Sequence, residues 1–330
     1  MNNFTAYPIL FEPVFVEIMW GGSLMGKILE RDIPDTGNPI AEAWDIVDRT
    51  EAESIIENGI YAGTSIRELL NSYGPEVIGK EYIPGRRFPL LVKIIDAGKK
   101  LSLQVHPNAA ACASDPNAEP KTEMWYVISA EKDAVIYAGL RSDCTKRMFL
   151  EKVNSGEIET CLQKFRSYPG DAYFISAGKV HAIGAGNLIL EIQQNSNTTY
   201  RLSDWGRMGA DGTPRELHIE QALNCIDFSD RSTPRITAQC SPGTRNIKAP
   251  LVSMCPHFQV DDLKLIETYK DFTNGSSFHL LSAPDNPVVI KANNFETELH
   301  SGRTCLLPAS TGSYTITPLE KSATVLKTHI

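Results

Sequence analysis

The sequence lacks the features of exported and membrane-spanning proteins. No run of about 18 apolar residues occurs in its 330 residues, and the first residues, MNNFTAYP, carry neither a basic stretch nor an apolar core. These absences predict a cytoplasmic protein with no membrane partner.

The chain also has too few basic residues to attract polyanions as a whole. Its 32 Lys and Arg face 40 Asp and Glu, which gives a formal net charge of −8. Such a molecule repels nucleic acid and anionic membrane surfaces, so neither is expected as a partner. A phosphorylated small molecule would have to meet a local basic pocket.

Paired cysteine motifs are missing too. The seven cysteines are scattered and odd in number, and no Cys-x-x-Cys pair occurs. This pattern argues against a disulfide framework and against a thiolate zinc site. The cysteines are expected to be small buried apolar residues.

The segments that are present indicate a mainly β protein, a sandwich or barrel with a few peripheral helices. Short strand-like runs recur between turn signals, an organisation typical of sandwiches and barrels. The expected strands of the first part are 88–96, 101–106, 124–128, 134–138, 172–175 and 188–193. Helical spacing occurs at 65–73, 145–154 and 216–225, and Ser65 with Glu68 predicts a capping box.

A connector between two domains is expected around residue 240. Residues 227–250 are rich in Ser, Thr, Pro, Arg and Gly and show no periodicity. We therefore expect a catalytic domain with helical additions at 1–240 and a smaller β domain at 241–330. The later strands are predicted at 258–266, 277–282, 288–291, 303–308, 312–317 and 323–326. No metal site is expected there, because His257, His279, His300 and His329 lack a Gly-x-x-His context and regular ligand spacing.

Four polar residues in the first part could surround one metal ion. Gln104 and His106 lie two apart in an extended segment, so their side chains face the same way. Glu123 opens the next strand, and a Gly-Asp turn, a strand and a Gly turn lead to His181. A shell of nitrogen and oxygen donors suits a borderline ion such as zinc. Any one of the histidines alone would more often be a hydrogen-bonded structural residue.

The spacing of these residues resembles the two cupin motifs, which bring His and Glu ligands together inside a barrel. The resemblance implies two cupin-like, jelly-roll β-sandwich domains. Two departures are visible, since Gln104 replaces the first His and Ser176 stands in place of the usual Pro. The gap from His106 to Glu123 is also longer than usual, which predicts an inserted loop.

More specific strings resemble the short bacterial form of the type I mannose-6-phosphate isomerases. The likeness is densest from residue 88 to 207, and Trp20-Gly21-Gly22 and residues 41–44 (AEAW) also fit. The matching strings are FPLLVK at 88–93, LSLQVHP at 101–107, KTEMWY at 121–126, GKVHAIG at 178–184, TTYR at 198–201 and DWGR at 204–207.

The resemblance implies a zinc enzyme, with one ion per chain, that interconverts mannose 6-phosphate and fructose 6-phosphate through an enediolate. It implies zinc ligands at Gln104, His106, Glu123 and His181. It implies catalytic roles for Arg201, Glu191 and Lys121, and substrate-binding roles for Trp20, Glu42, Lys93 and Ser102. The general base stays open between Glu191 and Lys121, with Glu42 a further candidate. Arg201 could contact the enediolate or the phosphate, or be a surface residue paired with Asp204.

Three positions depart from the family pattern. Ala43 replaces a usual Ser, Pro120 precedes Lys121 where longer members carry His, and Asn197 replaces a usual Asp. The last change removes a residue with a proposed part in proton handling. A non-catalytic sugar-phosphate-binding cupin and a metal-dependent cupin oxygenase remain as alternative functions, and the sequence does not indicate an oligomeric state.

Overall fold

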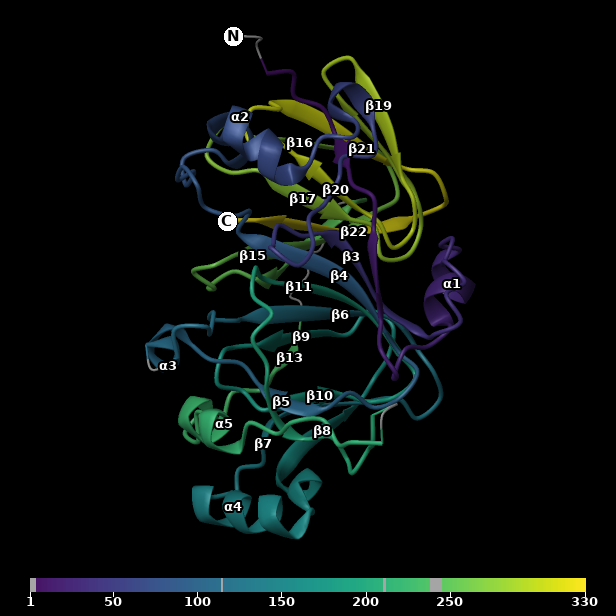
Figure 1. Cartoon of the computed structure of the whole chain (residues 1–330). Coiled ribbons are helices and arrows are strands. Elements are labelled where there is room, and N and C mark those ends of the chain that lie inside the picture. The colour runs from purple at the N-terminus through teal and green to yellow at the C-terminus, as the bar shows by residue number, and fades with distance from the viewer. Residues whose placement is uncertain (1–3, 114, 210–211, 238–244) are drawn as a thin grey trace. The chain divides into compact units, whose positions relative to one another are not determined.

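The computed structural model describes residues 4–113, 115–209, 212–237 and 245–330, and the chain is mainly antiparallel β-structure (Figure 1). This confirms the predicted fold class, with short helices at the periphery. No helix among the described residues is long and apolar enough to cross a membrane.

The chain divides into two compact units. The first unit contains Met1–Val14, Ala43–Ile94 and Thr237–Ile330, and the second contains Phe15–Glu42 and Ile95–Ile236. Three strands cross from one unit to the other: β2 (Val14–Glu17), β3 (Ile40–Ile46) and β4 (Leu90–Ala97). The predicted boundary at residue 240 lies outside the described residues, so the division into domains at 1–240 and 241–330 stays a prediction.

The second unit is built from two antiparallel sheets. One is a seven-stranded sheet of order β13-β9-β6-β11-β4-β3-β2. Its first four strands lie wholly in this unit, with bounds Arg235–Ile236, Ala172–Ile175, Glu123–Ala130 and Asn187–Gln194. The other has the order β12-β5-β10-β7-β8, with bounds Tyr200–Ser203, Leu103–Val105, His181–Ile183, Val135–Leu140 and Leu162–Arg166. One buried cluster joins Trp125, Tyr173 and Ile189 of the first sheet to Ile136 and Ile183 of the second. The two sheets therefore form a sandwich with a shared apolar core.

Helices cover the other face of the second sheet. In Figure 1, α4 (Lys146–Ser155) and α5 (Ile219–Cys225) lie beside the strands β5, β7 and β8. Phe149 of α4 and Ala222 of α5 belong to a buried cluster with Val105 and Tyr200. Around these residues the outer face of the sheet is apolar and covered by helices.

The sequence correctly indicated two of the longer helices by their local caps. The helix α2 (Ile66–Ile78) begins with the predicted capping box between Ser65 and Glu68, and Thr145 caps α4. Two short helices were missed, α1 (Leu24–Leu29) and α3 (Ala109–Cys112). The start of α1 is capped by Asp96, whose Oδ2 accepts a 2.7 Å hydrogen bond from the Met25 backbone N–H. That cap lies 71 residues away in the sequence, so no local pattern reveals it.

Because the cap of α1 is a buried carboxyl group, we expect the free energy of unfolding to depend on pH. Burial raises the pKa of Asp96 to about 6, although hydrogen bonds from Met25 and Leu24 act in the opposite direction. A raised folded-state pKa means that the contribution of Asp96 is complete below the unfolded value near 3.8 and is lost as the pH rises through about 6. The Asp96→Asn variant keeps an oxygen acceptor for Met25 but cannot ionise.

We expect the free energy of unfolding of the native chain, relative to Asp96→Asn, to fall by about 2 kcal/mol between pH 4 and pH 7. Urea unfolding at several pH values measures this difference. The exposed change Asp35→Asn is the control and should leave the pH dependence unchanged. The prediction would be contradicted if the free energy of unfolding changed with pH in the same way in the native chain and in Asp96→Asn.

The first unit is a second sandwich. Its six-stranded sheet has the order β1-β20-β17-β22-β15-β14, with bounds Ile9–Leu10, Thr304–Leu307, His279–Ser282, Ala323–His329, Gln259–Leu265 and Ile247–Val252. Its four-stranded sheet has the order β16-β21-β18-β19, with bounds Tyr269–Phe272, Ser313–Pro318, Val288–Ala292 and Phe295–Leu299. Leu281 and Val325 of the larger sheet share a buried cluster with Ile290 and Ile316 of the smaller one. The strands predicted beyond residue 250 are confirmed.

Candidate active site and metal centre

Three neighbouring strands place three predicted site residues side by side. In the antiparallel register, Gln104 of β5 lies opposite His181 of β10 on one side and opposite Arg201 of β12 on the other. Directly opposed residues of antiparallel strands point to the same face of the sheet. The alternate residues Val105 and Tyr200 belong to the apolar cluster on the other face. Gln104, His181 and Arg201 therefore face the interior of the sandwich together.

The facing sheet contributes two carboxylates. Glu123 begins β6, and Glu191 of β11 lies opposite Trp125 of β6. Both acidic residues are at most 2% exposed. The Trp125 indole Nε1 donates a 2.8 Å hydrogen bond to Oε2 of Glu191 and so fixes its orientation.

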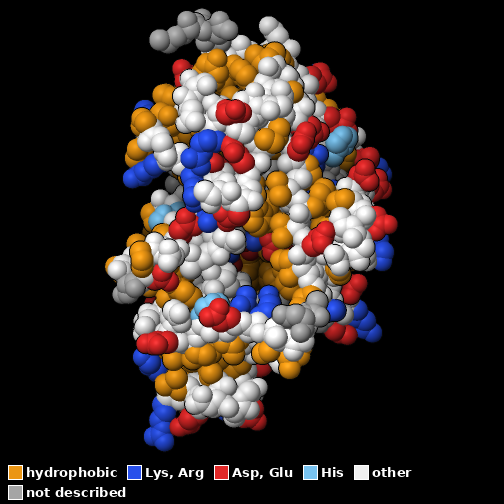
Figure 2. All heavy atoms as spheres, in the orientation of Figure 1, with side chains coloured by type: hydrophobic (Ala, Val, Ile, Leu, Met, Phe, Trp, Pro, Cys, Tyr) orange, Lys and Arg blue, Asp and Glu red, His pale blue; other side chains and the backbone are white. Residues whose placement is uncertain are grey.

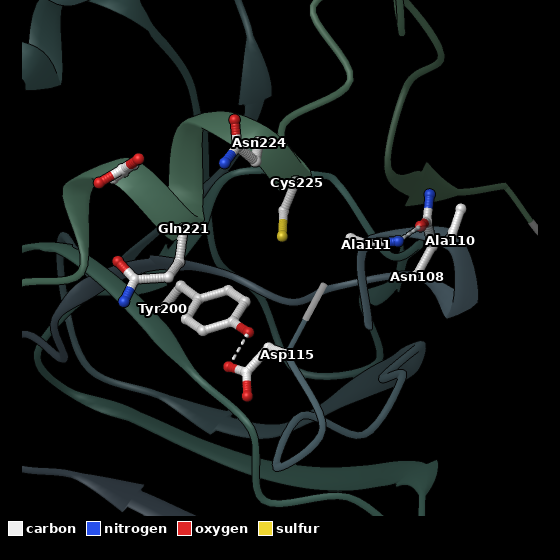
Figure 3. Close-up of a pocket in the computed structure, with 9 residues that line it drawn as sticks. Asn108, Ala110, Ala111, Asp115, Tyr200, Gln221, Asn224 and Cys225 are labelled. Atoms are coloured by element: carbon white, nitrogen blue, oxygen red, sulfur yellow. Dashed lines mark hydrogen bonds between the residues drawn. The ribbon is translucent and has the colours of Figure 1, made fainter. Parts of the chain in front are cut away.

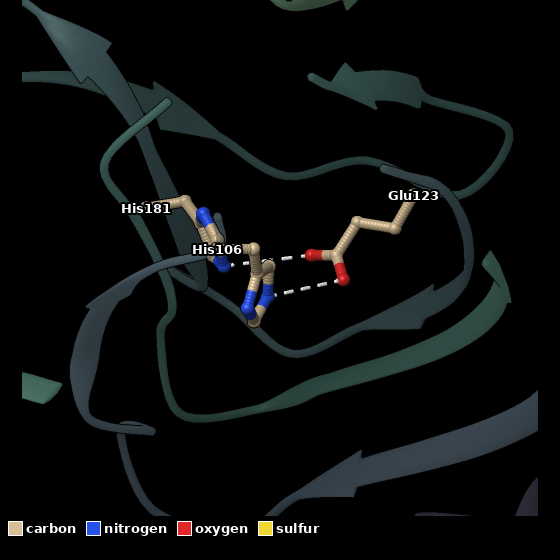
Figure 4. Close-up of side chains that lie close together, drawn as sticks. All are labelled: His106, Glu123 and His181. Carbon is tan, nitrogen blue, oxygen red and sulfur yellow. Dashed lines mark ion pairs between the residues drawn. The ribbon is translucent and has the colours of Figure 1, made fainter. Parts of the chain in front are cut away.

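His106, Glu123 and His181 form a compact cluster of possible metal ligands (Figure 4). The Nε2 atom of His106 lies 3.3 Å from Oε2 of Glu123, and the Nε2 atom of His181 lies 3.5 Å from Oε1. Two ligands about 2.1 Å from one tetrahedral ion are about 3.4 Å apart. The spacing of the three side chains therefore fits a single ion.

Backbone carbonyls orient both imidazole rings. The Nδ1 atom of His106 lies 2.8 Å from the carbonyl oxygen of Thr198, and Nδ1 of His181 lies 2.8 Å from that of Lys179. A carbonyl oxygen can only accept, so each Nδ1 carries the hydrogen and each Nε2 presents a lone pair to Glu123. This is the tautomer that a metal ligand requires.

The electrostatics of the cluster also suit a cation. Burial, followed by the Lys121 ammonium, lowers the pKa of His106 to about 4, and burial lowers the pKa of His181. Burial alone would raise the pKa of Glu123, but Lys121 and His106 outweigh it and hold that pKa well below its usual value. Two neutral imidazoles and one carboxylate are the ligand forms that bind divalent metals. Within the described residues, no hydrogen-bond donor of suitable geometry reaches the buried Oε1 of Glu123.

Gln104 is placed to add a fourth ligand. Its Nε2 lies 3.2 Å from Nε2 of His181, and its Oε1 accepts a 3.2 Å hydrogen bond from the Ser102 hydroxyl. The two ends of an amide group are assigned from their surroundings. Rotating this amide by half a turn would present Oε1 to the ion and leave Nε2 beside Ser102.

Lys121 connects the metal cluster to Glu191. Its Nζ lies 2.7 Å from Oε2 of Glu123, 3.6 Å from Oε1 of Glu191 and 3.2 Å from Nε2 of His106. The side chain is buried, with 5% of the residue exposed. A buried ammonium between two carboxylates offsets part of their negative charge and attracts both.

Three arginines gather beside the cluster. Arg207 and Arg215 both form ion pairs with Asp204, and Arg215 donates from Nε at 2.8 Å. No ion pair between Arg201 and Asp204 is among the described contacts, and the buried Nε of Arg201 has no hydrogen-bond partner among the described residues. The three guanidinium groups outnumber the nearby carboxylates of Asp204 and Glu216, which provides a local attraction for anions in an acidic protein.

Residues 9–124 match the family model for the phosphomannose isomerase type I catalytic domain. The chain is 39% identical over 224 residues to the mannose-6-phosphate isomerase ManA of Bacillus subtilis (strain 168), which covers 68% of this chain and 69% of ManA. It belongs to the type I mannose-6-phosphate isomerase family.

Further relatives extend over the whole chain. The putative mannose-6-phosphate isomerase YvyI of the same organism is 30% identical and covers 99% of this chain and 100% of its own. The crystal structure of the mannose 6-phosphate isomerase from Bacillus subtilis superposes with a TM-score of 0.88 at 30% identity, covering 99% of this chain and 100% of that one. The family resemblance predicted from the sequence is confirmed.

The remaining site residues predicted for a mannose-6-phosphate isomerase lie in several places. Trp20 is 4% exposed and packs in the same cluster as Trp125, while Ser102 is the donor to Gln104. Glu42 is buried on β3. Lys93 belongs to the first unit, where its Nζ lies 5.9 Å from the Trp44 ring centroid. The substrate-binding roles of all four stay predictions.

A separate cavity of about 630 Å³ lies on the other side of β12 (Figure 3). Tyr200 lines it and donates a 2.9 Å hydrogen bond to Asp115, and Gln221, Asn224 and Cys225 of α5 contribute further walls. No residue of the metal cluster lines this cavity. The candidate metal cluster and this cavity are therefore separate features of the structure.

Sequence reasoning missed residues that orient the site. Trp125 was part of a matching string, and its position two residues after Glu123 on a strand could have shown that both side chains face the core. Arg215 and His218 gave no such signal, because they reach Asp204 and Arg201 from a later loop.

Proposed function

We propose that this protein is a cytoplasmic enzyme that interconverts mannose 6-phosphate and fructose 6-phosphate with one zinc ion per chain. Family membership supports the reaction. The observation that carries the proposal is the buried His106, Glu123 and His181 cluster with Arg201 two strands away on the same face. Figure 2 shows acidic and basic side chains interspersed over one face of the molecule, with no broad basic surface there for a polyanion.

The zinc ligands in this proposal are His106, Glu123, His181 and Gln104. Nitrogen and oxygen donors in a four-residue shell are typical of zinc sites. The bound ion would supply a Lewis acid that polarises the substrate's carbonyl oxygen.

Glu191 is the proposed general base. Isomerisation takes a proton from the carbon next to the carbonyl and returns it to the neighbouring carbon, so one group must accept and then donate a proton. Trp125 binds Oε2 of Glu191 and so fixes the position of the carboxylate, whose Oε1 lies 3.6 Å from Nζ of Lys121. Lys121, whose ammonium lies beside both carboxylates, would then balance charge and donate hydrogen bonds to substrate oxygens.

Arg201 is proposed to stabilise the negative charge that develops on the enediolate oxygens. Its Nε is buried and without a hydrogen-bond partner among the described residues, as expected of a donor whose acceptor is a bound ligand. Arg207 and Arg215, held by Asp204, would attract the phosphate. Trp20, Glu42, Lys93 and Ser102 remain the proposed walls of the sugar pocket.

The metal requirement is tested by removal and replacement. We expect chelation to reduce fructose 6-phosphate formation to background and zinc to restore it, because a buried cluster of neutral imidazoles and a carboxylate needs the cation to act. The Glu123→Gln variant should fail to recover with zinc. Sugar-phosphate binding without turnover would favour the non-catalytic cupin, and recovery by iron with oxygen uptake would favour the oxygenase.

A further inference from the structure

Arg201 is held by a segment that carries none of the proposed ligands. The Arg201 backbone N–H donates a 3.2 Å hydrogen bond to Nδ1 of His218, and the His218 backbone N–H donates a 2.8 Å bond to the Arg201 carbonyl. The Arg201 guanidinium also donates from Nη1 to the carbonyl oxygen of Glu216, at 2.8 Å. Main chain and side chain of Arg201 are thus both fixed by residues 216–218.

The contacts of residues 216–218 with Arg201, here called the clamp, lie on the side of β12 where a further strand would pair. β12 is the first strand in the order of its sheet, so only β5 pairs with it among the described strands. The pairing with β5 is irregular between Arg201 and Ser203. A backbone at the edge of a sheet and beside an irregularity is weakly fixed. His218 supplies both the acceptor and the donor that a neighbouring strand would have provided.

The clamp also selects one form of the imidazole. An N–H group donates to Nδ1, so Nδ1 must hold a lone pair and the ring hydrogen must lie on Nε2. The Nε2 atom lies 3.9 Å from a carboxylate oxygen of Glu216, which favours a hydrogen at that position. The ring also lies against Tyr200, with centroids 6.1 Å apart.

We propose that His218 is a positioning residue of the isomerase: its Nδ1 lone pair fixes the backbone of Arg201 and, together with the Glu216 carbonyl, directs the guanidinium into the site. The inference rests on the proposed role of Arg201. A displacement of about 1 Å at a group that stabilises the reacting atoms can lower turnover by about 100-fold. His218 therefore acts on kcat through Arg201 without touching the substrate.

The test compares substitutions that keep or remove the acceptor. In His218→Asn, the amide oxygen can take the place of Nδ1, whereas His218→Leu has similar bulk and no acceptor. We expect kcat to fall about 10- to 100-fold in His218→Leu and to stay within about threefold of the native value in His218→Asn. Zinc content and melting temperature should be alike in the two variants. His300→Leu, at an exposed histidine of the first unit, is the matched control and should behave like the native enzyme.

A double variant separates this inference from the role of Arg201. If His218 acts through Arg201, adding His218→Leu to Arg201→Lys should lower kcat no further than Arg201→Lys alone. The positioning role would be overturned if the two substitutions multiplied their effects on kcat in the double variant. Equal losses of kcat in His218→Asn and His218→Leu would also overturn it. An Arg201→Lys enzyme with native kinetics would instead refute the proposed role of Arg201, whatever His218→Leu does.

Discussion

Replacing Glu191 with glutamine is expected to lower kcat by about 10²- to 10⁴-fold, the range typical of a lost general base. The amide keeps the shape of the side chain and can still accept the hydrogen bond from Trp125. It cannot take a proton at neutral pH. The measurement is the rate of fructose 6-phosphate formation, combined with exchange of the carbon-bound hydrogen in deuterated water, and both should fall together.

The competing assignment makes Lys121 the base. In that case Lys121→Met would abolish hydrogen exchange, and Glu191→Gln would retain most of it. Glu151→Gln removes an exposed carboxylate on α4 and serves as the matched control, with native kinetics expected. Zinc content must be measured in every variant, since Lys121 contacts Glu123 and its loss can alter metal binding.

The Arg201→Lys substitution should lower kcat by about 10²- to 10³-fold at unchanged zinc content. Lysine keeps the positive charge but loses the planar fork and the Nε donor, which is buried and without a hydrogen-bond partner among the described residues. If Arg201 contacts the enediolate, the loss falls mainly on kcat, because that charge develops only in the transition state. Steady-state kinetics in both directions provide the measurement.

Arg166→Lys is the control for this substitution, since Arg166 lies on β8 in an exposed ion pair with Asp133. A rise in KM with kcat nearly intact would show that Arg201 binds the phosphate equally in the ground state and in the transition state. Unchanged kinetics would make Arg201 a structural residue and move the assignment to Lys121.

Patterns within a few neighbouring residues, such as strand alternation and a capping box, correctly predicted several strands and helices. Period-two spacing placed Gln104 on the inner face of β5, and Ser65 with Glu68 located the start of α2. In contrast, β3 was missed although the equally buried β4 was predicted, because Ala41, Glu42, Ala43 and Asp45 are of residue types that are depleted in strands.

The partners of the site residues were less predictable. The spacing of Arg201 and Asp204 allowed a local ion pair, but Asp204 pairs with Arg207 and with Arg215, which arrives 11 residues later. The carbonyl oxygens of Thr198 and Lys179 that orient His106 and His181 are main-chain atoms. Side-chain identity carries no information about such contacts, so only the folded chain reveals them.

The ligands of the proposed metal come from both sheets of one sandwich: Glu123 opens β6 in one sheet, and His181 opens β10 in the other. A bound ion would therefore cross-link the two layers, and separating them would require its release. Ligand binding to the folded state alone adds about 1.4 kcal/mol of stability for each tenfold rise in free ligand above its Kd. The melting temperature of the catalytic layers would then report the free metal concentration, and a metal-starved cell would hold a more easily unfolded and degraded enzyme.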